Sequence, residues 1–408
     1  MTRDRAYFLL LNIGHFLDHL FTLVFATVAA LVLYREWGVS YDALLLYASP
    51  GFFAFGLFAL PSGWLADRWS RDGMMVVFFI GIGMSAIVTS QAQSPMQIGI
   101  GLFVLGMFAS IYHPVGLAIV TMKWKNTGMR IAANGVWGNL GVASAALITG
   151  YFIDHGGWRM AFIWPGVFSI LMGLAYLWLR WDGVWEEHRA GKPKAGVAAV
   201  EYKGMFLRVS IIVFITAAFG SIIFQSTTFA LPKMFEERLA GMAQLIADRM
   251  AQGDVATVIG SLAFLTFAVA SMAQLAVGAA LDKVGPRRVF ITVALIQIAF
   301  FAISPGLSDG VAFAVAFGFM LGAFGQIPIN DYLIGKMASG PARARIFAVR
   351  YVVSFTVLAA TLPLISVVHA NWGFDALFVI LALAALVILV AVWMLPRKMP
   401  VPEAVPAE

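Results

Sequence analysis

The chain has 408 residues, of which 61% are hydrophobic and only 12% are charged, and its mean hydropathy is +0.88. Soluble domains carry about 25% charged residues, so this composition excludes a water-soluble fold of this length. Cysteine is absent, which excludes disulfides and thiolate chemistry.

Long apolar runs dominate the chain from its first residues onward. A transmembrane helix needs about 20 apolar residues. The run after Met-Thr-Arg-Asp-Arg is too long for the apolar region of a secretory signal, so it is predicted to be the first span. The pattern predicts an all-α integral membrane protein with twelve transmembrane helices, at 6–33, 43–64, 74–92, 97–121, 131–153, 158–180, 206–232, 255–280, 288–304, 310–334, 346–368 and 374–396.

Charged breaks divide these spans into two halves. The longest break, 181–205, predicts a cytoplasmic linker between an N-terminal six-helix bundle (1–180) and a C-terminal one (206–396), with a cytoplasmic tail at 397–408. A second polar insert, 234–254, predicts an amphipathic helix on the outer surface, or alternatively a lid over an outer vestibule. Its apolar residues recur at three- and four-residue steps: Phe235, Leu239, Met242, Leu245, Ile246 and Met250.

The distribution of lysine and arginine predicts the topology. An even number of spans places both termini on one side. Of the 27 basic residues, 22 fall on the side of the termini, and only five fall on the other: Arg35, Arg159, Lys233, Arg238 and Arg249. Cytoplasmic loops are enriched in these residues, so both termini are predicted to be cytoplasmic. The net charge of +6 therefore reflects topology and not a nucleic-acid surface.

The sequences of the two halves repeat each other at an offset of about 215 residues. Gly63-Trp-Leu-Ala-Asp67-Arg68 corresponds to Gly278-Ala-Ala-Leu-Asp282-Lys283. Leu105-Gly106-Met-Phe108 corresponds to Leu321-Gly322-Ala-Phe324, and Arg130 corresponds to Arg345. Repeats of this kind place a solute site at the interface of the halves, near the bilayer midplane.

The repeated loop resembles the signature loop of the major facilitator superfamily, and Gly157-Trp158-Arg159-Met-Ala-Phe162 is also typical of that superfamily. The resemblance covers the whole chain and implies alternating access by rocking of two bundles. It also implies that the loops clamp the cytoplasmic side in the outward-facing state. The alternative is tight turns with solvated charges. The gating residues expected are Asp67, Arg68, Arg71, Arg130, Asp282, Lys283, Arg287, Asp331 and Arg350.

A narrower resemblance concerns spans one and four. Gly14-His15-Phe16-Leu-Asp18-His19 and Tyr112-His113-Pro114-x-Gly116 resemble the fosmidomycin-resistance branch of efflux proteins. The chain departs from the better-known drug/proton antiporters, because span four lacks their mid-membrane arginine and span five has no Gly-Pro pair. This departure argues against drug–proton antiport of the usual type.

Span one carries the densest set of polar residues. At 100° per residue, Asn12, His15, Asp18, His19 and Thr22 form one stripe. Ionisable groups inside a bilayer are costly, so the stripe predicts a cavity. We hypothesise that His15, Asp18, His19 and His113 form a proton-coupling and substrate-contact cluster. The alternatives are polar packing with Pro114 kinking span four, or a metal site of His15, Asp18 and His113.

The second half supplies neutral polar residues to the predicted cavity. Gln225 shares a face with Ser221 and Thr228, while Gln326 and Asn330 lie near Asp331, which is predicted to join an ion-pair gate with Lys336 and Arg350. Aromatic residues expected to line the cavity, or simply to pack, are Tyr112, Trp137, Phe224 and Phe324.

The function predicted is secondary active transport of a small organic solute across the cytoplasmic membrane, proton-coupled and in the efflux direction, by a monomer without cofactor. Uptake of a nutrient or metal chelate by the same fold is the alternative. An intramembrane enzyme is a remote alternative, because no His-Glu-x-x-His or Gly-x-Ser-x-Gly motif occurs. A channel would need a repeated pore loop, and nucleotide-driven pumping a Gly-rich phosphate loop, and the sequence has neither.

Overall fold

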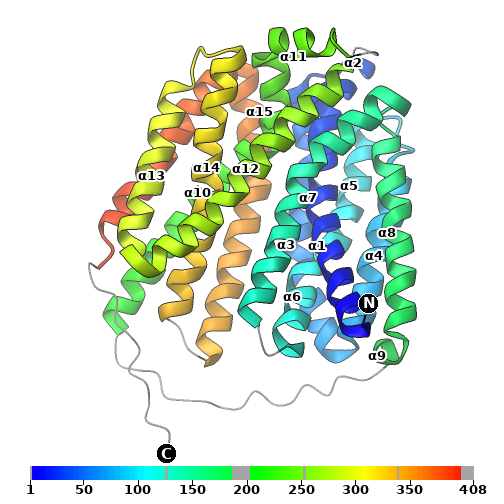
Figure 1. Ribbon diagram of the computed structural model, residues 1–408, viewed down its shortest axis with the longest axis vertical. Helices are drawn as coiled ribbons and strands as arrows, with labels where there is room; N and C mark the ends of the chain where they lie inside the picture. Colours follow the sequence, from blue (N-terminus) through cyan, green and yellow to red (C-terminus); the bar gives the residue numbers. More distant parts are fainter. Residues whose placement is uncertain (1, 125–126, 186–202, 251–253, 338–339, 397–408) are drawn as a thin grey trace, which may run out of the picture.

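A computed structural model describes residues 2–124, 127–185, 203–250, 254–337 and 340–396 of the chain. The described part is helical, and its helices form two bundles that lie side by side (Figure 1). The first bundle contains α1 (Arg3–Val28), η1 (Ala29–Leu33), α2 (Tyr34–Glu36), α3 (Tyr41–Arg68), α4 (Arg71–Thr89), α5 (Pro95–Ala109), α6 (Tyr112–Lys123), α7 (Thr127–Gly156), α8 (Met160–Leu179) and α9 (Trp181–Trp185). The second contains α10 (Lys203–Arg238), α11 (Ala240–Ala247), α12 (Val255–Val284), α13 (Pro286–Ile303), α14 (Asp309–Met337) and α15 (Gly340–Trp393).

The prediction of twelve spans agrees with these helices. Eleven segments within the described residues are long and apolar enough to cross a membrane. The last of them, Val352–Trp393, has 42 residues, and at 1.5 Å per residue it is about twice as long as a bilayer core is thick. It breaks at Gly373, whose φ of 71° is a left-handed conformation that favours glycine. The segment therefore counts as spans eleven and twelve.

Helix ends follow local sequence signals. Ser70 begins α4 by accepting a hydrogen bond from the backbone N–H of Gly73, and Ser94 caps α5, which starts at Pro95. In span four, Pro114 has no N–H to donate to the carbonyl of Ser110. The helix is accordingly broken between Ala109 and Tyr112, four residues before the proline, as the predicted kink requires.

The bundles meet mainly along two pairs of helices, α7 with α12 and α3 with α15, and α10 also contacts α1 and η1. Glycines allow close backbone contact in the first pair. A Cβ on Gly150 would lie 2.3 Å from the carbonyl oxygen of Ala256, and one on Gly260 would lie 2.4 Å from that of Ala146. Small residues of this kind are typical of packed membrane helices.

One prediction about the polar segments needs correction. The predicted linker 181–205 begins with helix α9, and α10 already starts at Lys203; residues 186–202 and the tail 397–408 lie outside the described residues. The prediction of a single amphipathic helix at 234–254 is wrong. Helix α10 continues to Arg238 and the separate α11 ends at Ala247, with Leu239, Ala243 and Ala247 buried. Leu245, Ile246 and Met250, predicted to belong to the apolar face, are exposed.

We call the face where α1 begins the terminal face and the opposite face, which carries α2 and α11, the distal face (Figure 1). Helix α1 is buried on most of its circumference, because α7, α8, α6 and α10 all contact it. The polar stripe of this helix therefore faces protein and not lipid.

Candidate functional site

Three ionisable residues of α1 meet one residue of α6 inside the first bundle. His15, Asp18 and His19 lie within one turn of α1, and His113 follows the break between α5 and α6. The Nε2 atoms of His15 and His19 are 3.2 Å apart, and Nε2 of His113 is 3.4 Å from Oδ2 of Asp18. The ring of His113 stands edge-on to both other imidazoles, with centroids 5.3 and 5.4 Å away. We call these four residues the histidine cluster.

Backbone and aromatic contacts fix the orientation of His15. Its Nδ1 lies 2.8 Å from the carbonyl oxygen of Asn134, and its ring stacks on Tyr112 with centroids 4.8 Å apart. A carbonyl oxygen can only accept, so Nδ1 carries a hydrogen and, in the neutral ring, Nε2 is an acceptor. Nε2 of His15 therefore accepts a hydrogen bond from Nε2 of His19.

Asn134 connects three helices beneath the cluster. Its side-chain nitrogen donates to Oδ1 of Asn12 at 2.9 Å and to the hydroxyl of Tyr112 at 2.8 Å, and the Tyr112 hydroxyl contacts the carbonyl oxygen of Leu11 at 2.8 Å. Asn134 is fully buried. Asn134 was not among the predicted site residues, although an asparagine in an apolar span is itself a signal for a buried polar network.

Asp18 is the least compensated group of the cluster. Its side chain is 0% exposed, and neither carboxyl oxygen has a hydrogen-bond partner among the described residues. His113 is the neighbour within ion-pair distance, and it retains 20% of its side-chain exposure. The cluster is therefore buried but not sealed from solvent.

The three imidazoles also have the spacing of a possible metal site. His15, His19 and His113 each offer a nitrogen, and these ligand atoms lie within 4.8 Å of one another. The alternative predicted from sequence used Asp18 in place of His19, so the structure groups a different set. Imidazole nitrogen is a ligand that suits divalent transition metals.

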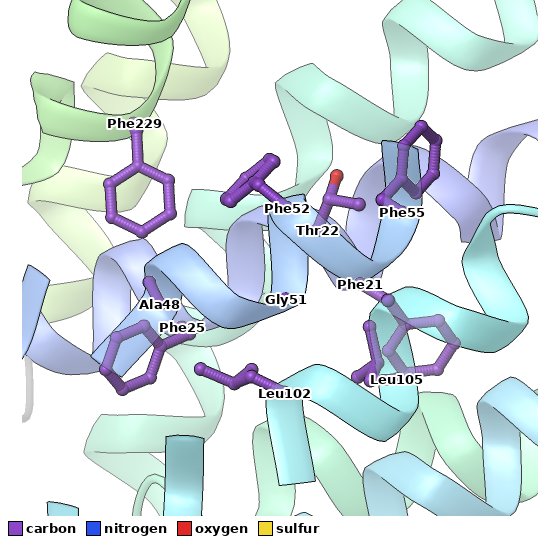
Figure 2. Close-up of a pocket in the computed structure, with 11 residues that line it drawn as sticks. Phe21, Thr22, Phe25, Ala48, Gly51, Phe52, Phe55, Leu102, Leu105 and Phe229 are labelled. Carbon is purple, nitrogen blue, oxygen red and sulfur yellow. The ribbon is translucent and has the colours of Figure 1, made fainter. Parts of the chain in front are cut away.

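Figure 2 shows a small aromatic pocket lined by Phe21 and Phe25, which follow the cluster residues along α1 toward the distal face. Its volume is about 20 Å³, enough for about one water molecule. Phe52 and Phe229 close it with ring centroids 5.7 Å apart, and Phe55 contacts Phe355 at 4.8 Å. Phe52 and Phe55 come from α3, whereas Phe229 and Phe355 come from the second bundle. Packed phenylalanines therefore obstruct the path from the cluster to the distal face.

The polar residues predicted in the second bundle are buried and bonded within that bundle. Gln326 accepts from Gln297 at 3.0 Å and donates to the carbonyl oxygen of Thr216 at 3.0 Å. Asn330 accepts from the Thr216 hydroxyl at 2.8 Å. Gln225 is 1% exposed, and its side-chain nitrogen lacks a partner among the described residues. Sequence reasoning missed Thr216 and Gln297 as their partners.

Polar contacts join the bundles at the distal face. Nδ1 of His369 lies 2.5 Å from Oδ1 of Asp42, across the interface of α15 and α3, and Nε2 lies 3.2 Å from Glu237. Glu236 accepts hydrogen bonds of 2.7 Å from both Tyr34 and Arg35. We call these contacts the distal latch.

A second link lies between α7 and α12 on the same face. Asp154 accepts from the backbone N–H and the hydroxyl of Thr257, each at 2.7 Å. None of the residues in these distal contacts was predicted to form a gate, and Arg35 was named only for its charge. The structure is closed at its distal face.

Five of the predicted gating residues make contacts within their own bundles at the terminal face: Asp67, Arg68, Arg71, Arg130 and Arg287. Asp67 pairs with Arg71 at 2.5 Å, and Arg130 lies over the rings of Phe8 and Trp124. Arg287 donates to the carbonyl oxygen of Trp393 at 2.9 Å. Arg68 lies over the ring of Trp64. The side chains of Asp282 and Lys283 are exposed, whereas Asp331 is half-buried and interacts with a neighbouring group. The side chains of Lys336, Arg345 and Arg350 lie outside the described residues.

A buried network near the terminal face was not predicted. Asp72 is 3% exposed and accepts hydrogen bonds from Tyr7 and Tyr176, both at 2.7 Å, and from two nitrogens of Arg180, at 3.0 and 2.6 Å. Partial burial acts against the charge of Arg180, but hydrogen bonds to Asp72 outweigh it and raise the pKa of the guanidinium. This network ties α1, α4 and α8 together directly after the first signature loop.

Two bundles of membrane-spanning helices, the first of which holds a buried polar cluster, are the architecture of a carrier of small solutes. Comparison with known families agrees. The sequence profile of the Major Facilitator Superfamily matches residues 11–248 and 250–408. The chain belongs to this superfamily of multi-pass membrane transporters, and it is not an enzyme.

Curated relatives are distant. A probable sulfoacetate transporter, SauU of Cupriavidus necator, is 24% identical over 48% of this chain and 49% of its own length. The 4-hydroxybenzoate transporter PcaK of Pseudomonas putida is 27% identical over 40% of this chain and 37% of its own. These matches span about half or less of those relatives. The multidrug resistance protein MdtG of Escherichia fergusonii is 24% identical over 90% of this chain and 89% of its own.

Solved structures share the fold. A peptide transporter POT superposes with a TM-score of 0.76 at 14% identity, covering 97% of this chain and 98% of that one. A bacterial homolog of the human lysosomal transporter Spinster, in an inward-facing and unoccupied conformation, gives 0.68 at 16% identity, covering 96% and 94%. At these identities the comparison shows the architecture alone.

Proposed function

We propose that this chain moves a small organic solute across the cytoplasmic membrane by alternating access, with the histidine cluster as its coupling and solute-contact site. One observation carries the proposal. Four ionisable side chains, His15, Asp18, His19 and His113, lie together inside membrane-spanning helices, with Asp18 fully buried. A charged carboxylate such as that of Asp18 costs about 2.5–3.5 kcal/mol at the centre of a membrane helix, which argues for a functional role.

The coupling ion we propose is the proton. Asp18 has no hydrogen-bond donor among the described residues apart from its contact with His113. A proton held between this carboxyl and the imidazole compensates the burial of both groups. Imidazole exchanges protons in the physiological pH range, so the cluster can take up a proton on one side and release it on the other.

The orientation we propose places both termini in the cytoplasm. The excess of lysine and arginine on the terminal side supports it. The distal latch then faces the outside, so the structure corresponds to a state closed to the outside. The domains act as rigid halves, 1–180 and 206–396, in a monomer.

For direction, we propose efflux, supported by the match to MdtG over most of the chain. Uptake is the second candidate. Partial matches to relatives named as sulfoacetate and 4-hydroxybenzoate transporters support it, and both of those named solutes are small organic anions.

A transport assay in proteoliposomes tests these proposals. Purified protein is first screened by thermal shift against a solute and metal panel at two pH values, and stabilising solutes are then assayed with an imposed pH gradient. We expect His15→Asn and His113→Asn to abolish gradient-driven accumulation. His155→Asn, which changes an imidazole outside the cluster, is the matched control.

The outcomes separate the parts of the proposal. Unchanged pH dependence in both cluster variants removes the proton role but leaves transport standing. If the solute accumulates only under a pH gradient opposite to the one that drives proton-coupled efflux, the proposed direction of transport is reversed. Failure of any solute to move in the wild-type protein, despite stabilisation by that solute, contradicts carrier function.

A further inference from the structure

A groove on the lipid-facing side of the first bundle is much larger than the pocket beside the histidine cluster. It lies between α4 and α5 and has a volume of about 570 Å³, against about 20 Å³ for the aromatic pocket. Met84 and Val88 of α4 and Ile100 of α5 line it and are 55%, 68% and 59% exposed. We call it the lateral groove.

The walls of the lateral groove do not require water. Its hydroxyl groups are bonded to their own helix, Ser85 to the carbonyl oxygen of Ile82 at 2.9 Å and Thr89 to that of Ser85 at 2.6 Å. The other polar side chains of the groove, Gln91 and Gln97, lie at its distal end, so a hydrocarbon chain placed below them leaves no hydroxyl donor unsatisfied.

The depth of the groove matches one leaflet. It runs from Thr89, at the distal end of α4, down to Gly81. Eight residues at 1.5 Å per residue make about 12 Å, close to half of the roughly 30 Å hydrocarbon core. An acyl chain of the leaflet on the distal side has the length to fill this groove.

Charged groups lie at the mouth of the groove. Ala92 lines the mouth, and its carbonyl oxygen accepts a hydrogen bond of 3.2 Å from Nη2 of Arg159. Nη1 of Arg159 lies 3.5 Å from Oε1 of Glu36, beyond normal hydrogen-bond length, and the two side chains are 39% and 38% exposed. Trp158 donates to the other oxygen of Glu36 at 2.9 Å and contacts Trp37, an arrangement typical of the membrane interface.

We propose that the lateral groove binds a phospholipid with a zwitterionic headgroup that carries a primary ammonium. The acyl chain lies along Val88 and Ile100, the phosphate accepts from Arg159, and the ammonium donates to Glu36. Because the contact between Arg159 and Glu36 is long, the cationic donors of Arg159 and the anionic acceptors of Glu36 are available side by side. This pair matches a headgroup that carries one negative and one positive charge. This site is independent of the proposed transport function.

Native mass spectrometry of the purified protein tests the proposal. Phosphatidylethanolamine, phosphatidylglycerol and phosphatidylcholine with identical acyl chains are added in detergent. We expect phosphatidylethanolamine to be retained preferentially, and Arg159→Gln to lower its retention about tenfold, the loss of one charge-assisted hydrogen bond. Ile100→Trp, which fills the groove, should lower retention of the same lipid to a similar extent.

The matched control is Val390→Trp, because Val390 is 58% exposed on α15 and Ile100 is 59% exposed. Both substitutions place a tryptophan on a lipid-facing surface, so a general effect of the bulky residue would appear in both. If the three lipids are retained equally, and neither Arg159→Gln nor Ile100→Trp changes their retention, the protein binds annular lipid only. That result would overturn the proposal. Preferential retention of phosphatidylglycerol would also overturn it, because the assigned headgroup would be wrong.

Discussion

Neutralising Asp42 should open the distal face. Asp42 is bonded to His369 only across the interface between α3 and α15, so the contact exists only while this face is closed. The Asp42 side chain is 17% exposed and that of His369 12%, so solvent screens the pair weakly. Asp42→Asn keeps the shape of the side chain but removes its charge.

The magnitude follows from the loss of that charge. Hydrogen bonds to charged groups contribute about 1.5–3 kcal/mol and neutral ones about 0.5–1.5 kcal/mol, so the substitution costs the closed state about 1–1.5 kcal/mol. A difference of about 1.4 kcal/mol is a factor of ten in the equilibrium constant. We therefore expect about a tenfold rise in the ratio of distal-open to distal-closed molecules.

Arg35→Gln should have a smaller effect, although it also removes a link between the bundles. The Arg35 side chain is 67% exposed, and Tyr34 still donates to Glu236 after the change. Exposed ion pairs contribute about 0.2–1 kcal/mol, so a shift of about twofold is expected.

Spin-label distances measure this ratio, and the absence of native cysteine allows two labels to be placed directly. Gln93→Cys and Ala370→Cys are exposed distal positions in different bundles. Asp375→Asn is the matched control, because Asp375 pairs with Arg238 at the same face but within one bundle. If Asp42→Asn leaves the distance distribution unchanged, or shifts it no more than Asp375→Asn does, the latch does not set the equilibrium.

Three further predictions concern the interior of the first bundle. Asp72→Asn should destabilise the protein by about 2 kcal/mol, because it leaves Arg180 without its carboxylate and the partial exposure of Arg180 reduces the usual cost of breaking a buried pair. The assay is the melting temperature in detergent, and Asp67→Asn, a change at an exposed residue, should leave that temperature unchanged. Asn134→Ala should cost about 1–3 kcal/mol in the same assay, because it leaves Asn12 and Tyr112 without their shared donor, and a melting temperature like that of wild type would contradict the proposed network. Gly138→Ala should abolish transport while the protein still folds, because its Cβ would lie 2.7 Å from the His15 ring; Gly135→Ala, which meets nothing within 4 Å, should transport normally.

The spans and the polar stripe of α1 could be predicted because each depends on local sequence. Apolar runs predict spans irrespective of what they pack against. Likewise, helical periodicity alone places His15, Asp18 and His19 on one face. The position of His113 depends on a different helix, and the structure places its Nε2 atom 3.4 Å from Oδ2 of Asp18.

Residues far apart in sequence were missed. His369, Asp42 and Glu237 belong to three helices and stand at span ends, where charged residues are common and carry no distinctive spacing. The predicted helix at 234–254 failed for a related reason. Periodicity suggested one amphipathic face, but α10 extends to Arg238 and packing on α12 and α14 decides which side of α11 is buried.

The sequence by itself determined that this protein is a twelve-span, two-part membrane protein with an ionisable stripe in its first helix. Hydropathy and helical period are properties of a single segment, and the lipid environment allows few alternatives to a helix. Only the tertiary structure decided which charges pair, which face is closed and where a lipid could dock. Those features depend on side chains from different helices meeting within a few ångströms, and spacing along one chain does not encode that distance.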